Sequence, residues 1–176
     1  KVLSNIVYRI RRPLAIIGLD KLIVGKSGTF VINPAYHIHT DFDRFEGNCR
    51  QLERTSDPDM RCALYHKAVE LYKGHLLPRI EHEIWHMQLD MYYQTLYLTI
   101  TKGYARYKLE RKNYTDALRE IKNAMQLAPG DSELSMLAVL AAWYQGGRVL
   151  ARRYYEAVKK YLDGDQIIQI RTQLGF

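Results

Sequence analysis

The stretch Tyr114–Pro129, which reads YTDALREIKNAMQLAP, carries the pattern that decides the fold. Small and larger apolar residues recur there at steps of three or four, which places them on one face of a helix. These residues are Ala117, Ile121, Ala124 and Leu127. Adding 34 to each of these numbers gives Ala151, Tyr155, Val158 and Tyr161, a similar alternation. Recurrence at a fixed spacing favours stacked helical repeats over an antiparallel bundle without repeats, because small residues let paired helices approach closely.

This pattern is similar to the second helix of a tetratricopeptide repeat, in which a proline such as Pro129 closes the unit. Asp131 is placed to cap the next helix, and Gly146-Gly147 separates that helix from the one after it. A thinner match surrounds Tyr65 and Ala68. The sequence therefore predicts an all-α fold, built as a tetratricopeptide-like array of helical hairpins.

Helical patterns extend from Thr40 almost to the end of the chain. Asp57 followed by Pro58 is typical of a helix start, and Gly74 ends that helix. A long helix begins at Trp85, and its apolar residues again step by three or four. After Trp85 they are Leu89, Tyr92, Leu96, Ile100, Gly103 and Tyr107. We expect all of them to lie on one buried face.

The charge of the chain is concentrated at its start. The 176 residues carry a formal net charge of +7, from 26 Lys and Arg against 19 Asp and Glu. Residues 1–33 contain one acid, Asp20, and the basic residues Lys1, Arg9, Arg11, Arg12, Lys21 and Lys26, which makes +5. This distribution favours a short basic segment, and not a uniformly basic body, as the part that meets an anionic partner. The composition, 47% hydrophobic and 26% charged, excludes a disordered or collagen-like chain.

Along the basic segment, the spacing of the apolar residues changes from one typical of a helix to one typical of strands. One helical face is indicated by Leu3, Val7, Ile10 and Leu14. After Gly18, residues 22–24 and 29–32 are typical of two short strands, joined by the glycine-rich turn 25–28. Asn33-Pro34 ends this part. We therefore expect a domain boundary there, with one domain over residues 1–33 and another over residues 34–176.

The order of these parts resembles a known family. Residues 3–12, LSNIVYRIRR, are similar to the recognition helix of the OmpR-like winged helix-turn-helix of response regulators, and residues 22–32 are similar to its wing hairpin. The rest resembles the bacterial transcriptional activator domain of the Streptomyces antibiotic regulatory protein family. Its parts follow in order: Asp41-Phe42 to Phe45 at the first helix, Ala68 to Leu77-Pro78 with Gly74, Trp85 at the long helix, then the repeats.

The resemblance implies a cytoplasmic regulator of transcription, an activator, that binds DNA through a complete winged helix. The missing strands and helices, and a phosphate-receiver domain of a phosphorelay, would lie upstream of Lys1. The helical domain would mediate contacts with RNA polymerase or another protein, homodimer formation or effector sensing. The implied DNA-binding residues are Asn5, Tyr8, Arg9, Arg11, Arg12, Lys26 and Ser27. Arginine can contact guanine edges or phosphates, and the sequence leaves both open.

The basic helix departs from the family pattern in two respects. Pro13 predicts that it stops or kinks at Arg12, since proline removes a hydrogen bond and clashes with the preceding turn. Without the preceding elements, Leu3, Val7 and Ile10 lose their usual partners, and each costs about 1.5–3 kcal/mol if it stays in water. We therefore expect these 176 residues alone to bind DNA poorly, and the apolar stripe to pack on the helical domain or a second chain.

One motif favours a different class of protein. His82-Glu83-Ile84-Trp85-His86 matches the H-E-x-x-H pattern, in which two histidines hold zinc and the glutamate activates water, as in a zinc metalloprotease. Leu89 and Tyr92 stand where an extended zinc motif needs glycine and histidine. Glu110 would lie about 36 Å from His86 on a continuous helix, too far to share a metal. We therefore favour a helix start with exposed histidines and a core Trp85, and expect neither enzyme activity, nor a cofactor, nor a metal.

The remaining composition adds three expectations. Cys49 and Cys62 make no disulfide framework, which indicates a reducing compartment. The longest apolar run, residues 134–144, is too short for a bilayer, so we expect no membrane partner. The 14 tyrosines are typical of core packing, and some of them would line a concave groove for a peptide, a partner helix or a small effector. Such a groove belongs to the alternative function, a tetratricopeptide-like interaction scaffold or effector sensor without DNA binding.

Overall fold

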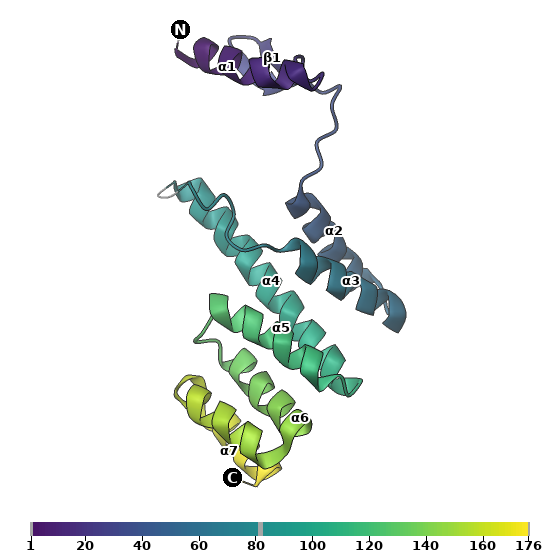
Figure 1. Ribbon diagram of the computed structural model, residues 1–176, viewed down its shortest axis with the longest axis vertical. Helices are drawn as coiled ribbons and strands as arrows, with labels where there is room; N and C mark the ends of the chain where they lie inside the picture. The colour runs from purple at the N-terminus through teal and green to yellow at the C-terminus, as the bar shows by residue number, and fades with distance from the viewer. Residues whose placement is uncertain (1, 81–82, 176) are drawn as a thin grey trace. The chain divides into compact units, whose positions relative to one another are not determined.

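The chain forms two compact units, one up to Thr40 and one from Asp41 onward, in a computed structural model that describes residues 2–80 and 83–175 (Figure 1). The segment 34–40 therefore clusters with the first unit and not with the helical second unit. Among the described helices, none is both long enough and apolar enough to cross a membrane.

The first unit contains a helix and a two-stranded antiparallel hairpin: α1 (Val2–Ile16), β1 (Ile23–Lys26) and β2 (Thr29–Ile32). The strand register pairs Ile23 with Ile32 and Lys26 with Thr29, so only Ser27 and Gly28 form the loop. Both loop residues have positive φ, 49° and 81°, as in the mirror-image turns whose twist matches that of paired strands. The predicted hairpin is confirmed, with a tighter turn than the predicted residues 25–28.

Helix α1 continues through Pro13 and ends at Ile16, so a stop at Arg12 is wrong, and the alternative of a kink there stays a prediction. Proline has a φ that suits a helix, and it removes only the one backbone hydrogen bond that its missing N–H would make. The helix ends instead where Gly18 takes a φ of +75° and Leu19 N–H donates to the carbonyl oxygen of Leu14 (2.8 Å).

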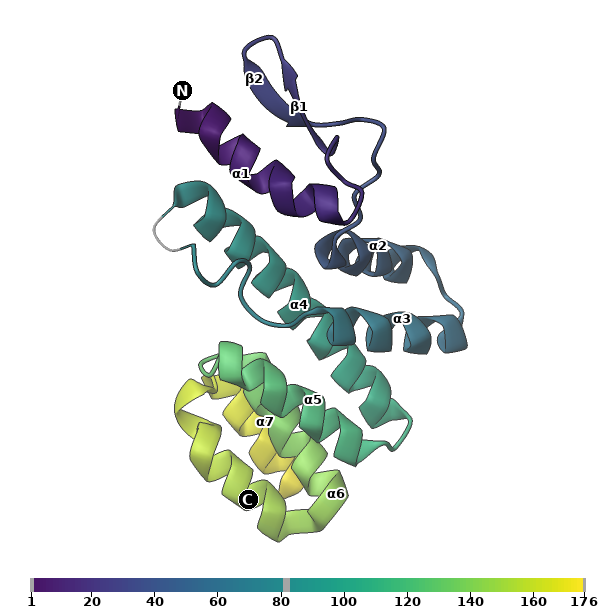
Figure 2. The same cartoon turned by 45° about the horizontal axis from the view of Figure 1, so that its top comes forward.

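The second unit is an array of helices, which confirms the predicted all-α class. Its elements are α2 (Asp41–Arg54), α3 (Pro58–Leu71), α4 (Ile84–Glu110), α5 (Tyr114–Leu127), α6 (Ser132–Val158), the 3₁₀ turn η1 (Lys159–Tyr161) and α7 (Gly164–Leu174). Each of these α-helices packs against the next one in the chain (Figure 2). The predicted caps are present as well, since Asp57 accepts from Asp59 N–H and Asp131 accepts from Leu134 N–H.

Helix α6 consists of two helical segments with a break at Gly146-Gly147, where the sequence predicted a separation. Gly147 has φ +66° and ψ −161°, which no helix contains. A comparable turn joins α4 to α5, where Lys112 has φ +62°. Lys112 and Gly147, the residues with positive φ in these two turns, are 35 residues apart, one more than the 34 that separate the two apolar patterns. The two turns therefore recur at nearly the same spacing as the helical pattern.

The core contains the small residues that defined the repeat. Ala117, Ile121 and Ala124 are fully buried, and their counterparts Ala151, Tyr155 and Val158 are at most 7% exposed. Tyr65 and Ala68 of α3 are also buried. All of these side chains except Ala117 belong to two clusters, one centred on α2–α5 with the start of α6, the other on α6 and α7. Burial of the whole stack is what α-helices of this length need for stability.

The prediction of one continuous buried face on the long helix is wrong for its first half. Ile100 is buried, but Trp85, Leu89 and Tyr92 are 43–51% exposed. Helix α4 has 27 residues, whereas its partners α3 and α5 have 14 each. At about 1.5 Å per residue, neither partner can cover the full length of α4.

Candidate functional site

The first unit presents a cationic helix face. Arg9 and Arg12 are exposed on α1, as are Asn5 and Tyr8. Within residues 2–80 and 83–175, neither arginine makes an ion pair or a hydrogen bond. Asp20 is the one acidic residue of residues 1–33. The two guanidinium groups are therefore available to an external anion.

Arg11 has a different position from its neighbours. Its Nε and Nη2 atoms donate to the carbonyl oxygen of Ile23, at 3.0 and 2.6 Å. Its guanidinium carbon also lies 6.0 Å from the centre of the Phe30 ring, at the limit of a cation–π contact. Arg11 thus fastens α1 to the hairpin. The sequence could not separate this role from that of Arg9 or Arg12, since all three are arginines on one helix.

The turn of the hairpin carries the other two predicted residues. Lys26 and Ser27 are exposed, and Thr29 Oγ1 donates to the carbonyl oxygen of Lys26 (2.7 Å), which stiffens the turn. An exposed cation on a short, rigid turn and two exposed arginines on the attached helix can neutralise phosphates of a nucleic acid backbone. The first unit is therefore the candidate nucleic-acid interface of this chain.

The apolar stripe of α1 is only partly covered. Val7 is 5% exposed and Leu14 is half-buried, whereas Leu3 and Ile10 are 56% and 42% exposed. Burial of these last two residues against the helical domain or a second chain stays a prediction.

The loop between α3 and α4 is fastened to the start of α4. Asp90 Oδ1 accepts from Leu76 N–H (2.7 Å), and its Oδ2 lies 2.7 Å from His75 Nδ1. The Nε2 atom of buried His86 makes a further short hydrogen bond to the carbonyl oxygen of Leu76. Burial alone would raise the pKa of Asp90, but the hydrogen bonds from His75 and Leu76 outweigh it and lower the pKa.

These contacts to the loop explain the position of one residue of the H-E-x-x-H motif. His86 is buried, and not exposed as predicted, because its ring holds the loop at Leu76. Glu83 is exposed and precedes the first residue of α4, and His82 lies outside the described residues. Among the residues that the structure describes, no three His, Cys, Asp or Glu side chains lie together as a metal ion would need.

The tyrosines divide between core and surface. Tyr72 stacks on Tyr97 with ring centres 4.1 Å apart, in the core of the second unit. Tyr114 and Tyr144 stack at 5.1 Å in a different place, on the wall of an open pocket of about 530 Å³. That pocket is also lined by Met136, and it could hold an apolar group of a ligand.

Cys49 is a buried cysteine of low expected reactivity. Both cysteines are free thiols, and Cys49 is 4% exposed. Burial, followed by the nearby charges of Glu46 and Glu53, raises the pKa of Cys49 to about 12, so the thiolate that would react is scarce.

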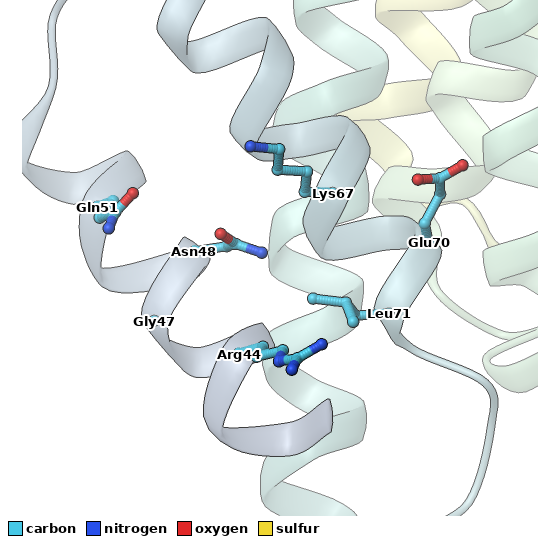
Figure 3. Close-up of a pocket in the computed structure, with 7 residues that line it drawn as sticks. All are labelled: Arg44, Gly47, Asn48, Gln51, Lys67, Glu70 and Leu71. Carbon is cyan, nitrogen blue, oxygen red and sulfur yellow. The ribbon is translucent and has the colours of Figure 1, made fainter. Parts of the chain in front are cut away.

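A groove of about 480 Å³ between α2 and α3 was not foreseen from the sequence (Figure 3). It is lined by Arg44, Gly47, Asn48, Gln51, Lys67, Glu70 and Leu71. The one signal that could have indicated it is Gly47, because glycine in the interior of a predicted helix calls for a reason.

A known protein family matches most of the second unit. The sequence model of this family, described as BTAD, Bacterial transcriptional activator domain, matches residues 40–167. The match starts at the junction of the two units and reaches the first residues of α7. No curated protein matches the chain.

Proposed function

Because this chain belongs to the family of the bacterial transcriptional activator domain, we propose that it is part of a DNA-binding activator of transcription in the cytoplasm of a bacterium. In this proposal the first unit is the C-terminal part of an OmpR-like winged helix, with α1 as its recognition helix and the hairpin as its wing. The second unit is a tetratricopeptide-like array that contacts RNA polymerase or another protein, or a second copy of the chain. The family is regulatory, and we assign the chain no catalytic activity.

One observation carries the DNA-binding part of the proposal. Residues 1–33 carry five of the seven net charges, and Arg9 and Arg12 are exposed there without protein partners in the described chain. The order of a cationic helix followed by a hairpin supports a winged helix, in which such a helix meets bases and phosphates and the wing meets the backbone. Arg11 holds this helix against the hairpin, through its hydrogen bonds to the carbonyl oxygen of Ile23.

The test measures how the affinity of the protein for a short DNA duplex of arbitrary sequence depends on the salt concentration. Each phosphate contact contributes about 0.9 to the slope of log K against log salt. The double variant Arg9→Ala/Arg12→Ala should therefore reduce the slope by about 2. The matched control is Arg50→Ala/Arg119→Ala, which removes two charges from the second unit, where Arg50 pairs with Glu46 and Arg119 pairs with Asp116. Equal slopes for the wild type and the Arg9/Arg12 variant would refute DNA binding through α1.

A second candidate function is effector sensing without DNA, and the pocket beside Tyr114 and Tyr144 favours it. Its apolar wall and aromatic stack suit a small aromatic or aliphatic effector. The test screens small aromatic and aliphatic compounds for those that raise the melting temperature of the wild type. If these compounds stabilise the Tyr144→Ala variant equally, this candidate is contradicted.

A further inference from the structure

The groove between α2 and α3 lies on the surface of this helix pair, outside its packed face. The inward face of α2 contributes Phe45, Cys49 and Leu52 to the core. Gly47 and Asn48, in contrast, line the open groove. The groove floor is therefore supported by a packed interior, which gives a ligand a rigid surface.

Gly47 has no structural reason to be glycine. It lies inside α2, where glycine is among the least favourable residues for a helix. A Cβ atom added to it would meet no atom within 4 Å, and its φ is not positive. Gly103 of α4 differs, because a Cβ there would lie 2.8 Å from the Tyr65 hydroxyl. Neither packing nor backbone geometry accounts for Gly47, whereas a ligand that approaches the α2 backbone closely would.

Two cations face this groove from opposite helices. Figure 3 shows Arg44 directed from α2 toward α3, and Lys67 lines the same groove from α3. Neither makes a hydrogen bond or an ion pair to any residue of the described chain. Glu70, the acid at the rim, lies 3.3 Å from His66 on its own helix. Two unpaired cations on either side of one groove favour an anionic ligand.

The other lining groups suit an extended peptide. The Asn48 amide, directed toward α3 in Figure 3, can donate to a peptide carbonyl and accept from a peptide N–H. Leu71 offers an apolar contact from the opposite wall. Arg44 and Asn48 are one helical turn apart, about 6 Å, and residues on the same side of an extended strand repeat at about 7 Å.

We propose that the groove between α2 and α3 binds an extended acidic segment of a partner protein. Carboxylates of the segment lie against Arg44 and Lys67, its backbone is held by Asn48, and Gly47 lets the chain lie close to α2. This proposal rests on the protein-contact part of the proposed function and names the chemistry of the partner. It does not depend on DNA binding, so the experiment below tests it separately.

The test uses the whole chain and a hexaglutamate peptide as the probe, with hexaserine as the uncharged probe. Titration of the ¹⁵N-labelled protein should shift the amide signals of Gly47 and Asn48 with hexaglutamate and not with hexaserine. Signals that shift only within residues 2–40 would place binding on the basic first unit and overturn the proposal. A hexathymidylate that shifts Gly47 and binds more tightly than hexaglutamate would overturn it in favour of nucleic acid.

Substitutions separate the groove from general charge attraction. Arg44→Ala/Lys67→Ala should weaken hexaglutamate binding at least tenfold, while the control Arg50→Ala, on the same helix, changes it less than twofold. Gly47→Ala should weaken binding at least tenfold and also raise the melting temperature by about 2–4 °C, since alanine favours the helix. A Gly47→Ala protein that is more stable and binds as well as the wild type would contradict the proposal, as would equal losses for the Arg50 control.

Discussion

The contact between α3 and α4 depends on Gly103, and replacing this residue tests the packing directly. A Cβ at Gly103 would lie 2.8 Å from the Tyr65 hydroxyl and 3.2 Å from its ring carbon Cε1. Tyr65 has little freedom to move away, because its hydroxyl accepts from Arg61 (3.0 Å) and its ring stacks on Tyr104 at 5.4 Å. Gly103→Ala should therefore push α3 and α4 apart or displace the ring.

Two opposing effects determine the size of the change. Alanine in place of glycine stabilises a helix interior by about 1 kcal/mol, and overpacking a filled contact costs about 1–3 kcal/mol. Gly47→Ala in α2 gains the helix stabilisation without the overpacking cost, because the space around Gly47 is open. The free energy of unfolding of Gly103→Ala should thus lie about 1–3 kcal/mol below that of Gly47→Ala.

Urea unfolding followed by tryptophan fluorescence is the suitable assay. Both tryptophans, Trp85 and Trp143, belong to the second unit, so the signal reports the unfolding of that unit. Adding Tyr65→Phe removes the hydroxyl at 2.8 Å, and the penalty of Gly103→Ala should shrink by about 0.5 kcal/mol or more in that background. If Gly103→Ala stabilises the protein as much as Gly47→Ala does, the reasoning about this contact is refuted.

Three further predictions concern single side chains. Asp131 caps α6 and lies 2.6 Å from Lys102, so Asp131→Ala should lower the free energy of unfolding by about 1–2 kcal/mol in urea titrations, and Asp131→Asn, which keeps the cap, by clearly less. The lowered pKa of Asp90 means that this carboxylate stabilises the fold above about pH 4 and that its contribution is lost as the pH falls through the folded-state pKa. Asp90→Ala should therefore cost about 1.5–3 kcal/mol at neutral pH and show a shallower acid-induced loss of stability than the wild type; parallel pH curves would contradict this. Arg11→Ala should broaden or shift the amide signals of the hairpin in NMR spectra, because Arg11 holds the hairpin through Ile23. Arg12→Ala should leave those signals in place.

The helices, the hairpin and most caps could be predicted because their causes are local. Apolar steps of three or four mark a helix wherever they occur, and Asp57 before Pro58 or Ser27-Gly28 between short strands act through their own backbone. The expected stop before Pro13 was wrong for a related reason, since a sequence rule counts the lost hydrogen bond but not the neighbouring bonds that remain.

The candidate sites could be predicted only in part. The concentration of charge in residues 1–33 is a property of composition, so the basic segment is evident from the sequence alone. The difference between Arg11, held by Ile23, and exposed Arg9 is not, because it depends on where the hairpin lies against α1. The groove at Gly47 was missed because its second wall comes from α3, which the sequence does not place.

By itself, then, the sequence determined the helical class, the recurrence of the apolar pattern and the basic N-terminal segment, since periodicity, turn chemistry and charge are carried by neighbouring residues. Only the tertiary structure decided which apolar residues are covered. Trp85 and Leu89 continue the same stripe as buried Ile100, yet they are exposed because α4 is longer than the helices beside it. His86 is buried because the loop that contains Leu76 lies over it. A periodic pattern predicts which face of a helix is apolar, but the lengths and paths of the partner elements decide how much of that face is removed from water.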